Sequence, residues 1–474
     1  MRRRRKKKPS SSPAKGDRRG ASPEAIARRL AEADKAYVWH PFTPMKQHLA
    51  MEPLVIESGE GFELIDTRGN RYIDGSSSLW CNLHGHRVPQ IDSAVRDQLG
   101  RIGHSTLLGL ACPPSIELAE RLVRIAPKGL AKVFYSDSGA TAVEVALKMA
   151  FQYWRNRGFP KRRRFIALRE GYHGDTIGSV SVGGIEAFHR TFRPLLFRTT
   201  FVDSPNPFYH PDGESAGRAV LRQIDQALSS AAGEYCAVIV EPLIQGAAGM
   251  LTHTGGFLPG LRDLTRRRGV LLIADEVATG FCRTGTLFAC RQEGVCPDLM
   301  CLGKGLTGGY LPVAATLTTQ EVFDAFLGEP HEGKTFYHGH TYTGNALGCA
   351  AAVASVDLIF SSGLLATLPR KARRIRHRLA ELRGHPHVAD IRQCGMMVGI
   401  DLMRDPSARL AFDPELRVGA GVCFHARRHG IIIRPLGDVV VLMPAPAMDL
   451  ETLDRLLTGV VASVHEYFRQ TKPV

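Results

Sequence analysis

Short apolar runs alternate with helical patterns between residues 130 and 302 of this chain. The runs are expected to form strands at 133–136, 165–168, 237–241, 270–275 and 299–302. Such alternation predicts an α/β fold in which a mostly parallel sheet carries helices on both faces. Ligands of these sheets bind beyond the carboxyl ends of the strands. Because Gly139, Tyr172, Glu241, Asp275 and Lys304 lie at or just after those ends, we expect a ligand site at that edge.

Residues 25–75 and 346–472 show a different, α+β pattern. Helical periodicity at 365–382, 417–428 and 450–468 alternates with strand candidates at 397–402, 431–433 and 439–442. We expect the two chain ends, 25–75 and 346–472, to build one smaller domain beside a large domain at 76–345. A length of 474 residues suits two domains of ordinary size.

The positive charge of the chain is concentrated at its N-terminus. The formal net charge is +15, and residues 1–20 hold ten Lys or Arg against the single acid Asp17, so they carry +9 and the remaining residues +6. A run of this kind cannot bury apolar area, so residues 1–24 are expected to form a disordered tail. A nucleic-acid-binding protein acting through this tail is an alternative. Since no basic stripe with interleaved aromatic residues continues it, we predict no specific nucleic-acid partner.

Other features of the sequence bear on where the protein works. No apolar stretch reaches the roughly 20 residues that a membrane helix needs, and no apolar segment follows the positive start as in a secretory signal. The ten cysteines are scattered without a C-x-x-C pair, as expected for reduced thiols. The His-Gly-His triplets at 84–86 and 338–340 have no third ligand at a recognisable spacing. We expect a cytoplasmic protein without membrane contact or a metal.

Lys304 and Asp275 suggest the chemistry of the site. Lys304 lies between Gly303 and Gly305, and Asp275 closes an apolar run 29 residues earlier. A carboxylate at the end of such a run needs a cation, because burial without one would drive it neutral. Pyridoxal phosphate (PLP) needs both groups: an amine for its Schiff base and a carboxylate that keeps the pyridine nitrogen protonated. In the structural alternative, Glu276 and Arg283, which lie close to Asp275, form the pairing there and no cofactor is involved.

A helix is expected to start at Gly139. The segment 134–141 leads into apolar positions at helical spacing from Val143 to Trp154. Free N–H groups and the positive end of the helix dipole make a phosphate site, with Gly139 letting an anion approach the backbone closely. The alternative is an ordinary Ser or Asp N-cap. After the next strand, Tyr172 could stack on a flat cofactor ring, or it could simply pack a loop.

Residues 303–308 also match the G-x-G-x-x-G pattern of dinucleotide-binding loops. That pattern must open a helix within a βαβ unit. Here residues 310–316 contain Pro312 and are expected to be extended. The context therefore disfavours a dinucleotide site.

Four motifs in sequence resemble those of the class III aminotransferases over about residues 35–470. They are Ser138-Gly139-Ala140, Gly171-Tyr172-His173-Gly174, 273–277 with 280–285, and Gly303-Lys304-Gly305. The resemblance implies PLP-dependent transferase fold type I, a homodimer, and an active site completed at the subunit interface.

Within that class the chain is similar to the 8-amino-7-oxononanoate aminotransferases (diaminopelargonate synthases) of biotin synthesis. The matching segments are 39–43, 74–80, 104–106, 148–154, 338–345 and 434–437. The resemblance implies a transaminase that converts 8-amino-7-oxononanoate to 7,8-diaminononanoate by ping-pong kinetics through the Schiff base on Lys304. Its partners would be this keto substrate and an amino donor.

The resemblance also implies a role for individual residues. Lys304 is expected to be the catalytic amine, Asp275 the partner of the ring nitrogen, and Tyr172 the residue stacked near the ring. The phosphate is expected to bind Gly139 and Ala140, and also His340 and Thr341 of the other subunit. The substrate pocket is expected to use these residues: Phe42, Leu79, Trp80, Tyr172, Gly339 and Arg434, with Arg434 clamping the substrate carboxylate.

Three positions depart from the family pattern. Ala140 stands where many members have Ser, so a hydroxyl contact to the phosphate is lost. Phe42 and Val441 stand where members that use S-adenosylmethionine have Tyr, and members with such replacements include ones that use lysine. The donor is therefore expected to be S-adenosylmethionine, with lysine as the alternative. Another class III aminotransferase, acting on an ω-amino acid with pyruvate or 2-oxoglutarate, is the alternative enzyme.

Overall fold

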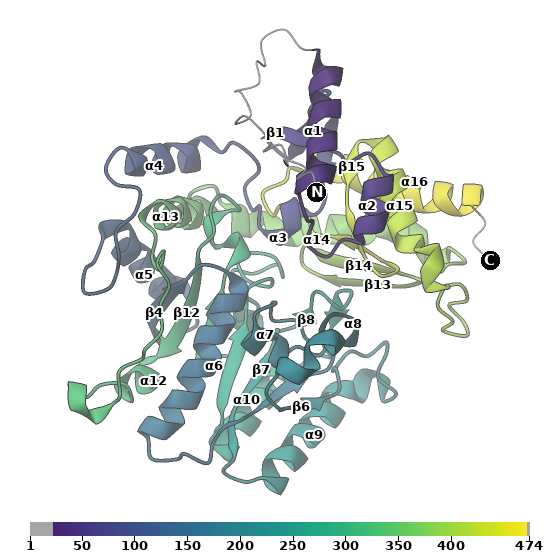
Figure 1. Ribbon diagram of the computed structural model, residues 1–474. Helices are drawn as coiled ribbons and strands as arrows, with labels where there is room; N and C mark the ends of the chain where they lie inside the picture. The colour runs from purple at the N-terminus through teal and green to yellow at the C-terminus, as the bar shows by residue number, and fades with distance from the viewer. Residues whose placement is uncertain (1–21, 472–474) are drawn as a thin grey trace, which may run out of the picture.

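The computed structural model describes residues 22–471 (Figure 1). Most of the predicted basic tail, residues 1–21, lies outside the described residues. Helix α1 (Pro23–Tyr37) is capped by Ser22, whose side chain accepts a hydrogen bond from the Ala25 N–H. Residues 23 and 24, which were predicted to belong to the tail, are therefore helical.

The main sheet lies at the centre of the larger part of the molecule (Figure 1). Across the sheet its strands are β4 (Leu130–Ser136), β12 (Ala314–Thr319), β11 (Leu299–Leu302), β10 (Leu271–Asp275), β7 (Tyr235–Val240), β5 (Arg164–Leu168) and β6 (Thr199–Val202). Strand β12 runs antiparallel to both of its neighbours, and the other pairs are parallel. All five predicted strands are confirmed within a few residues. Strand β6 was not predicted, and the expected extended stretch at 310–316 only partly overlaps β12.

Helices cover both faces of this sheet, as the alternating pattern predicts. One face packs against α6 (Gly139–Asn156) through residues such as Phe165, Ile239 and Ile273. The next residue along each strand points to the opposite face, which packs against α9 (Ala216–Ser230) and α10 (Phe257–Arg268). Strands buried on both sides read as continuous apolar runs, and every residue of β7 and β10 is buried.

A second group of sheets combines both ends of the chain. In one, β1 (Ile56–Glu60), β2 (Glu63–Asp66) and β3 (Arg71–Asp74) are antiparallel, and β15 (Ile431–Ile432) joins β3 in parallel. The other is antiparallel and has the order β13 (Val388–Cys394), β14 (Met397–Leu402), β17 (Val439–Leu442) and β16 (Arg434–Leu436). Predicted strands at 397–402 and 439–442 coincide with β14 and β17. The domain limits at 76 and 345 stay predictions.

Helices α14 (Leu364–Leu379), α15 (Val418–Ala426) and α16 (Leu450–Thr471) pack beside these sheets, at the right of Figure 1. The remaining helices and the β8–β9 hairpin are α2 (Met45–Ala50), α3 (Ser77–Trp80), α4 (Pro89–Leu99), α5 (Pro113–Ile125), α7 (Ile177–Ser181), α8 (Glu186–His189), α11 (Ala289–Gln292), α12 (Gln320–Asp324), α13 (Ala346–Ser361), β8 (Ile244–Gln245) and β9 (Leu251–Thr252). Among the described residues no single helix is long and apolar enough to cross a membrane. The bent helix pair Ala346–Ser361 and Leu364–Gly384 together has the length and composition of a membrane span, and only these two properties support it.

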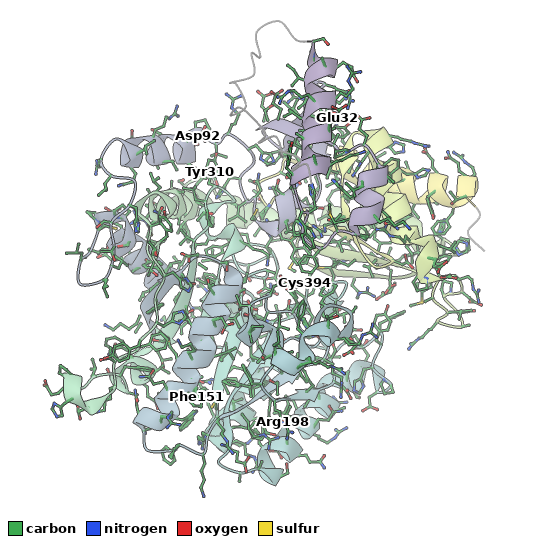
Figure 2. The ribbon with its side chains drawn as sticks, viewed as in Figure 1. Glu32, Asp92, Phe151, Arg198, Tyr310 and Cys394 are labelled. Atoms are coloured by element: carbon green, nitrogen blue, oxygen red, sulfur yellow. The ribbon has the colours of Figure 1, made fainter. Side chains whose placement is uncertain are left out.

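The loop that follows Lys304 is tied to the helices beside the sheet. The Tyr310 hydroxyl donates a hydrogen bond of 2.8 Å to the Asp92 carboxylate on α4, and both residues are labelled in Figure 2. Helix α13 packs against α4, α5 and the short 3-10 helix Lys304–Thr307. Residues 303–308 therefore open a single 3-10 turn, and the dinucleotide-binding pattern lacks the helix that it requires.

Candidate active site

A cavity of about 450 Å³ lies at the carboxyl ends of the central strands. Six of the predicted residues line it: Trp80, Gly139, Ala140, Tyr172, Asp275 and Lys304. Its volume lies in the range of small-molecule sites. Trp80 comes from α3, and the other five lie at or just after the ends of β4, β5, β10 and β11, so the sheet collects them at one edge as predicted.

Lys304 presents a buried amine to this cavity. It follows β11 directly and has a left-handed backbone conformation, with φ of 41°. Burial lowers the pKa of the amine, although Asp275 and Glu241 oppose that shift. Lys304 Nζ lies 5.5 Å from the centroid of the Trp80 ring and makes no hydrogen bond within residues 22–471. A buried amine without a partner is available for covalent chemistry.

Asp275 is held by His173, a contact that the sequence analysis did not identify. The two side chains are buried, and His173 Nδ1 lies 2.7 Å from Asp275 Oδ2. Because an ionised carboxylate only accepts hydrogen bonds, His173 carries its proton on Nδ1. The Val277 N–H donates to the other carboxylate oxygen at 3.0 Å. The carboxylate is thus fixed in orientation at the cavity wall.

The structural alternative for Asp275 is wrong, because Glu276 and Arg283 have other partners. Glu276 accepts hydrogen bonds from the Thr279 hydroxyl and from the N–H groups of Ala289 and Cys290. The buried Arg283 guanidinium donates to Ser77 Oγ and to the carbonyl oxygens of Asn82 and Pro444. Both side chains tie loops together, which leaves the Asp275 carboxylate beside the cavity.

Glu241 is a second acid at the cavity, and no role was predicted for it from the sequence. Its two oxygens accept hydrogen bonds from the N–H groups of Tyr172, at 3.0 Å, and Gly246, at 2.9 Å. Burial raises the pKa of Glu241 to about 7, although the nearby His173 has the opposite effect and lowers this pKa. Glu241 therefore holds the main chain of Tyr172 at the end of β5, and its charge changes near neutral pH.

The first turn of α6 is built for close packing as well as for an anion. Ser138 and Thr141 form a capping box, with the Ser138 N–H donating to Thr141 Oγ1 at 2.9 Å. The N–H groups of Gly139 and Ala140 face no acceptor within the described chain. A Cβ on Gly139 would lie 2.4 Å from Val277 Cγ1. Both sequence interpretations, N-cap and anion site, are compatible with this turn, and the close approach of Val277 is a further reason for a glycine at position 139.

Aromatic rings continue from Tyr172 along one wall. The Tyr172 hydroxyl donates to Asp175 at 2.6 Å, and its ring lies edge-on to Phe188, with centroids 6.1 Å apart. Phe42, about half exposed, packs edge-on against the other side of Phe188 at 5.4 Å. Phe42 is therefore connected to the cavity through one intervening ring. Leu79, beside Trp80, is half exposed with φ of 79°.

Six predicted residues do not line this cavity: Phe42, Leu79, Gly339, His340, Thr341 and Arg434. Gly339, His340 and Thr341 line a separate surface hollow of about 1480 Å³, where His340 Nδ1 lies 2.7 Å from the Asp137 carboxylate. Arg434 is exposed on β16, opposite Val441 of β17, and Val441 belongs to the same apolar cluster as Trp80. The roles of these residues stay predictions.

The chain that builds this cavity is similar to known proteins in sequence and fold. The sequence pattern described as Aminotransferase class-III matches residues 45–464. The chain belongs to the class III aminotransferase family. It is 53% identical over 447 residues to the adenosylmethionine-8-amino-7-oxononanoate aminotransferase of Nitratidesulfovibrio vulgaris, covering 93% of this chain and 82% of that protein.

Solved structures agree with this family. The crystal structure of the adenosylmethionine-8-amino-7-oxononanoate aminotransferase of Methanocaldococcus jannaschii superposes with a TM-score of 0.89 at 43% identity, covering 93% of this chain and 99% of that one. An amine transaminase from an uncultivated Pseudomonas species, in a PLP-bound form, gives 0.87 at 34% identity, covering 90% and 98%. The predictions of an aminotransferase, of fold type I and of PLP as the cofactor are confirmed.

The residues at the cavity fit this cofactor on their own chemistry. Lys304 supplies an amine with no other partner, Asp275 a carboxylate of fixed orientation, and Gly139 and Ala140 two N–H groups at a helix N-terminus. All three kinds of group line the same cavity, as an amine-linked heterocycle with a phosphate requires.

Proposed function

We propose that this aminotransferase transfers an amino group to 8-amino-7-oxononanoate to form 7,8-diaminononanoate in biotin synthesis. The observation that supports it is the joint exposure of Lys304 and Asp275 to one cavity in a chain 53% identical to a protein named for this substrate. The donor is S-adenosylmethionine, which the names of the relatives include, or lysine.

Lys304 is the group that moves protons in this proposal. When bound, PLP delocalises the electron pair left on the amine-bearing carbon of a substrate. Lys304 Nζ would take the proton released from that carbon and pass it to the cofactor within the same half of the reaction, and the other half would run these transfers in reverse on the keto substrate. Burial lowers the pKa of this amine, which favours its role as a base. The surrounding apolar residues exclude water that would compete for the proton.

The remaining cavity residues hold and orient the cofactor. Asp275 pairs with the ring nitrogen of the cofactor, and His173 holds its carboxylate in orientation. The first-turn N–H groups of Gly139 and Ala140 bind the phosphate, with no hydroxyl from position 140. The Tyr172 ring packs on the cofactor ring, positioned by the Glu241 contact to its backbone.

Binding of the two substrates uses the pocket margin. Arg434 clamps the carboxylate of the keto substrate, whose aliphatic chain lies along Leu79 and Trp80. Phe42 completes the wall, and Gly339 reaches the substrate of a partner subunit. Phe42 and Val441 offer no hydroxyl to a polar donor, so the choice between S-adenosylmethionine and lysine rests on packing at these positions.

A homodimer is part of the proposal, and so is a cytoplasmic location. Gly339, His340 and Thr341 line a hollow distinct from the cavity of their own chain. If His340 and Thr341 contact a phosphate, they contact that of a partner subunit, and dimerisation becomes a condition of activity. The ten free cysteines suit a reducing compartment.

The test is product formation with defined donors. Purified protein with PLP is incubated with 8-amino-7-oxononanoate and either S-adenosylmethionine or lysine, and the diamine is quantified by mass spectrometry. One donor is expected to give product, and Lys304→Ala is expected to lower turnover by at least about 10⁴-fold while leaving the fold intact. The matched control is Lys334→Ala, an ion-paired lysine outside the cavity.

The outcomes separate the levels of the proposal. No diamine with either donor, but transamination of an ω-amino acid with pyruvate or 2-oxoglutarate, would refute the substrate and keep the family chemistry. Full turnover in Lys304→Ala would refute the role of the lysine.

A further inference from the structure

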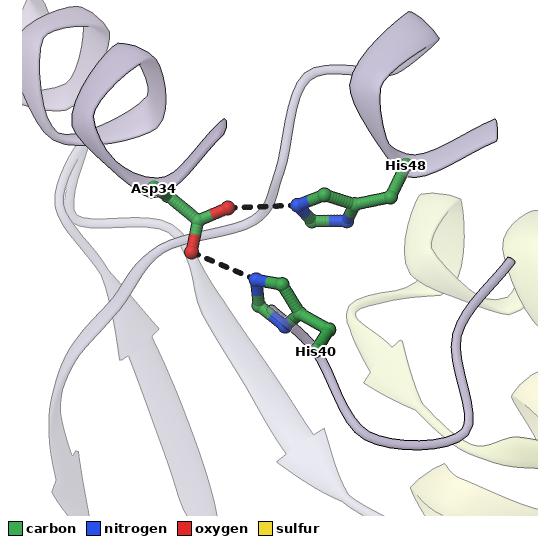
Figure 3. Close-up of side chains that lie close together, drawn as sticks. All are labelled: Asp34, His40 and His48. Carbon is green, nitrogen blue, oxygen red and sulfur yellow. Dashed lines mark hydrogen bonds and ion pairs between the residues drawn. The ribbon is translucent and has the colours of Figure 1, made fainter. Parts of the chain in front are cut away.

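Asp34, His40 and His48 meet at one point outside the active-site cavity. His40 Nε2 lies 2.8 Å from Asp34 Oδ1, and His48 Nε2 lies 2.7 Å from Asp34 Oδ2 (Figure 3). The three residues come from different segments: Asp34 from α1, His40 from the connection that follows, and His48 from α2. The three ligand atoms lie within 4.8 Å of one another.

We propose that these side chains form a binding site for a divalent transition-metal ion, with Zn²⁺ as the ion that suits it best. Two imidazole nitrogens and one carboxylate are a ligand set that Zn²⁺ commonly uses, with a fourth position left to water. Both histidines turn the same kind of atom, Nε2, toward one carboxylate. The proposal does not depend on the aminotransferase reaction.

The distances need only a small adjustment to hold an ion. With bonds of about 2.0–2.1 Å in tetrahedral geometry, neighbouring ligand atoms lie about 3.4 Å apart. The observed separations of 2.7 and 2.8 Å are hydrogen-bond distances, so the ligand atoms must move apart by about 0.6–0.7 Å. The side chains are 32% (His40), 14% (His48) and 19% (Asp34) exposed, which leaves them room to move and the ion a path to enter.

Binding of an ion exchanges the hydrogen bonds of the cluster for metal bonds. Neutral imidazole is the form that binds metal ions, so a ring that binds Zn²⁺ through Nε2 carries its single proton on Nδ1. Binding therefore exchanges each Nε2–Asp34 hydrogen bond for a nitrogen–metal bond, with the ring proton on Nδ1, while the carboxylate forms one oxygen–metal bond.

The position of the cluster suggests what an ion would do. His40 and Phe42 are two residues apart, and Phe42 has a left-handed backbone, with φ of 51°, and packs against Phe188. An ion bound by α1, α2 and His40 would fix the segment that carries Phe42. This site would thus stabilise one margin of the substrate pocket without touching the reacting groups.

The test is the metal content of the PLP-loaded protein, prepared without a polyhistidine tag. After chelation and dialysis against Zn²⁺, the wild type is expected to hold one more ion per chain than His48→Gln. Glutamine can still donate a hydrogen bond to Asp34, so this variant keeps the contact and loses the nitrogen ligand. His331→Gln, which changes an exposed histidine in the segment Pro330–Glu332, controls for incidental binding and is expected to match the wild type.

A second measurement controls for misfolding of the variants. Co²⁺ in place of Zn²⁺ is expected to give a visible absorption band in the wild type that disappears in His48→Gln and in Asp34→Asn, while the visible spectrum of bound PLP stays unchanged. Equal metal content in the wild type and His48→Gln, or no Co²⁺ band in the wild type, would overturn the proposal. The cluster would then only connect α1 and α2 through hydrogen bonds.

Discussion

Replacing Gly139 by alanine tests why the first turn of α6 has a glycine. The backbone there is not left-handed, so alanine is compatible with its conformation. The added Cβ would lie 2.4 Å from Val277 Cγ1 and 3.1 Å from Cγ2. Val277 follows Asp275 by two residues, and its N–H holds the Asp275 carboxylate. A shift of Val277 therefore reaches both the phosphate end and the ring end of the proposed site.

The cost can be worked out from these contacts. Overpacking of one methyl group costs about 1–3 kcal/mol, against a gain of about 0.4–1 kcal/mol from restricting the unfolded chain. We expect Gly139→Ala to lower the free energy of unfolding by about 1–2 kcal/mol. In a Val277→Ala background the nearest atom becomes Val277 Cβ at 3.3 Å. The same substitution should there be neutral or slightly stabilising.

The assay is a double-mutant cycle. Urea unfolding of the cofactor-free protein, followed by fluorescence, gives the four free energies, and titration with PLP gives the four dissociation constants. A coupling of about 1–3 kcal/mol between the two positions is expected. PLP affinity should fall in Gly139→Ala and recover at least partly in the double variant.

The result that would refute this reasoning is additivity. If Gly139→Ala costs the same with Val277 and with Ala at position 277, the glycine is not required by packing. If PLP affinity is lost equally in both backgrounds, the glycine serves the anion directly, as the sequence analysis supposed.

Two further predictions concern the buried groups around Asp275. His173→Ala leaves one Asp275 oxygen without its 2.7 Å donor and should cost about 1–3 kcal/mol in urea unfolding, with partial recovery in His173→Gln; an unchanged midpoint would contradict the contact. Burial raises the pKa of Glu241 from 4.5 to about 7. Between these two pH values the native state keeps a proton that the unfolded chain releases. The stability contributed by Glu241 is therefore present below pH 4.5 and lost as the pH rises to about 7. Relative to Glu241→Gln, the free energy of unfolding of the wild type should fall by up to roughly 3 kcal/mol across that range, and parallel pH profiles would exclude the shift.

The central strands could be predicted because their burial is visible locally. Strands β7 and β10 are covered on both faces, which requires apolar residues at consecutive positions. Strand β12 gave no such signal. It follows Pro312 and inserts antiparallel between β4 and β11. Its partner β4 lies about 180 residues earlier in the sequence, and such a long-range pairing cannot be recognised from the local sequence.

Much of the candidate site was also visible in the sequence, since a buried carboxylate and a lysine between glycines each imply a partner. Which partner they take was not visible. Asp275 and Glu276 are adjacent in sequence, yet Asp275 faces the cavity and His173, whereas Glu276 accepts from Ala289 and Cys290. Successive side chains at the end of a strand point in opposite directions, and only the surrounding loops decide which acid meets the ligand.

The sequence by itself therefore determined the elements, the family and the groups that carry the chemistry, because apolar periodicity and motif spacing are local properties of the chain. Tertiary structure alone decided that His173 holds Asp275, that Val277 requires a glycine at position 139, and that Asp34 gathers His40 and His48. Each of these depends on which loops meet at a sheet edge or helix end. Long-range contacts of this kind are set by packing of the whole core, which no segment of the sequence specifies alone.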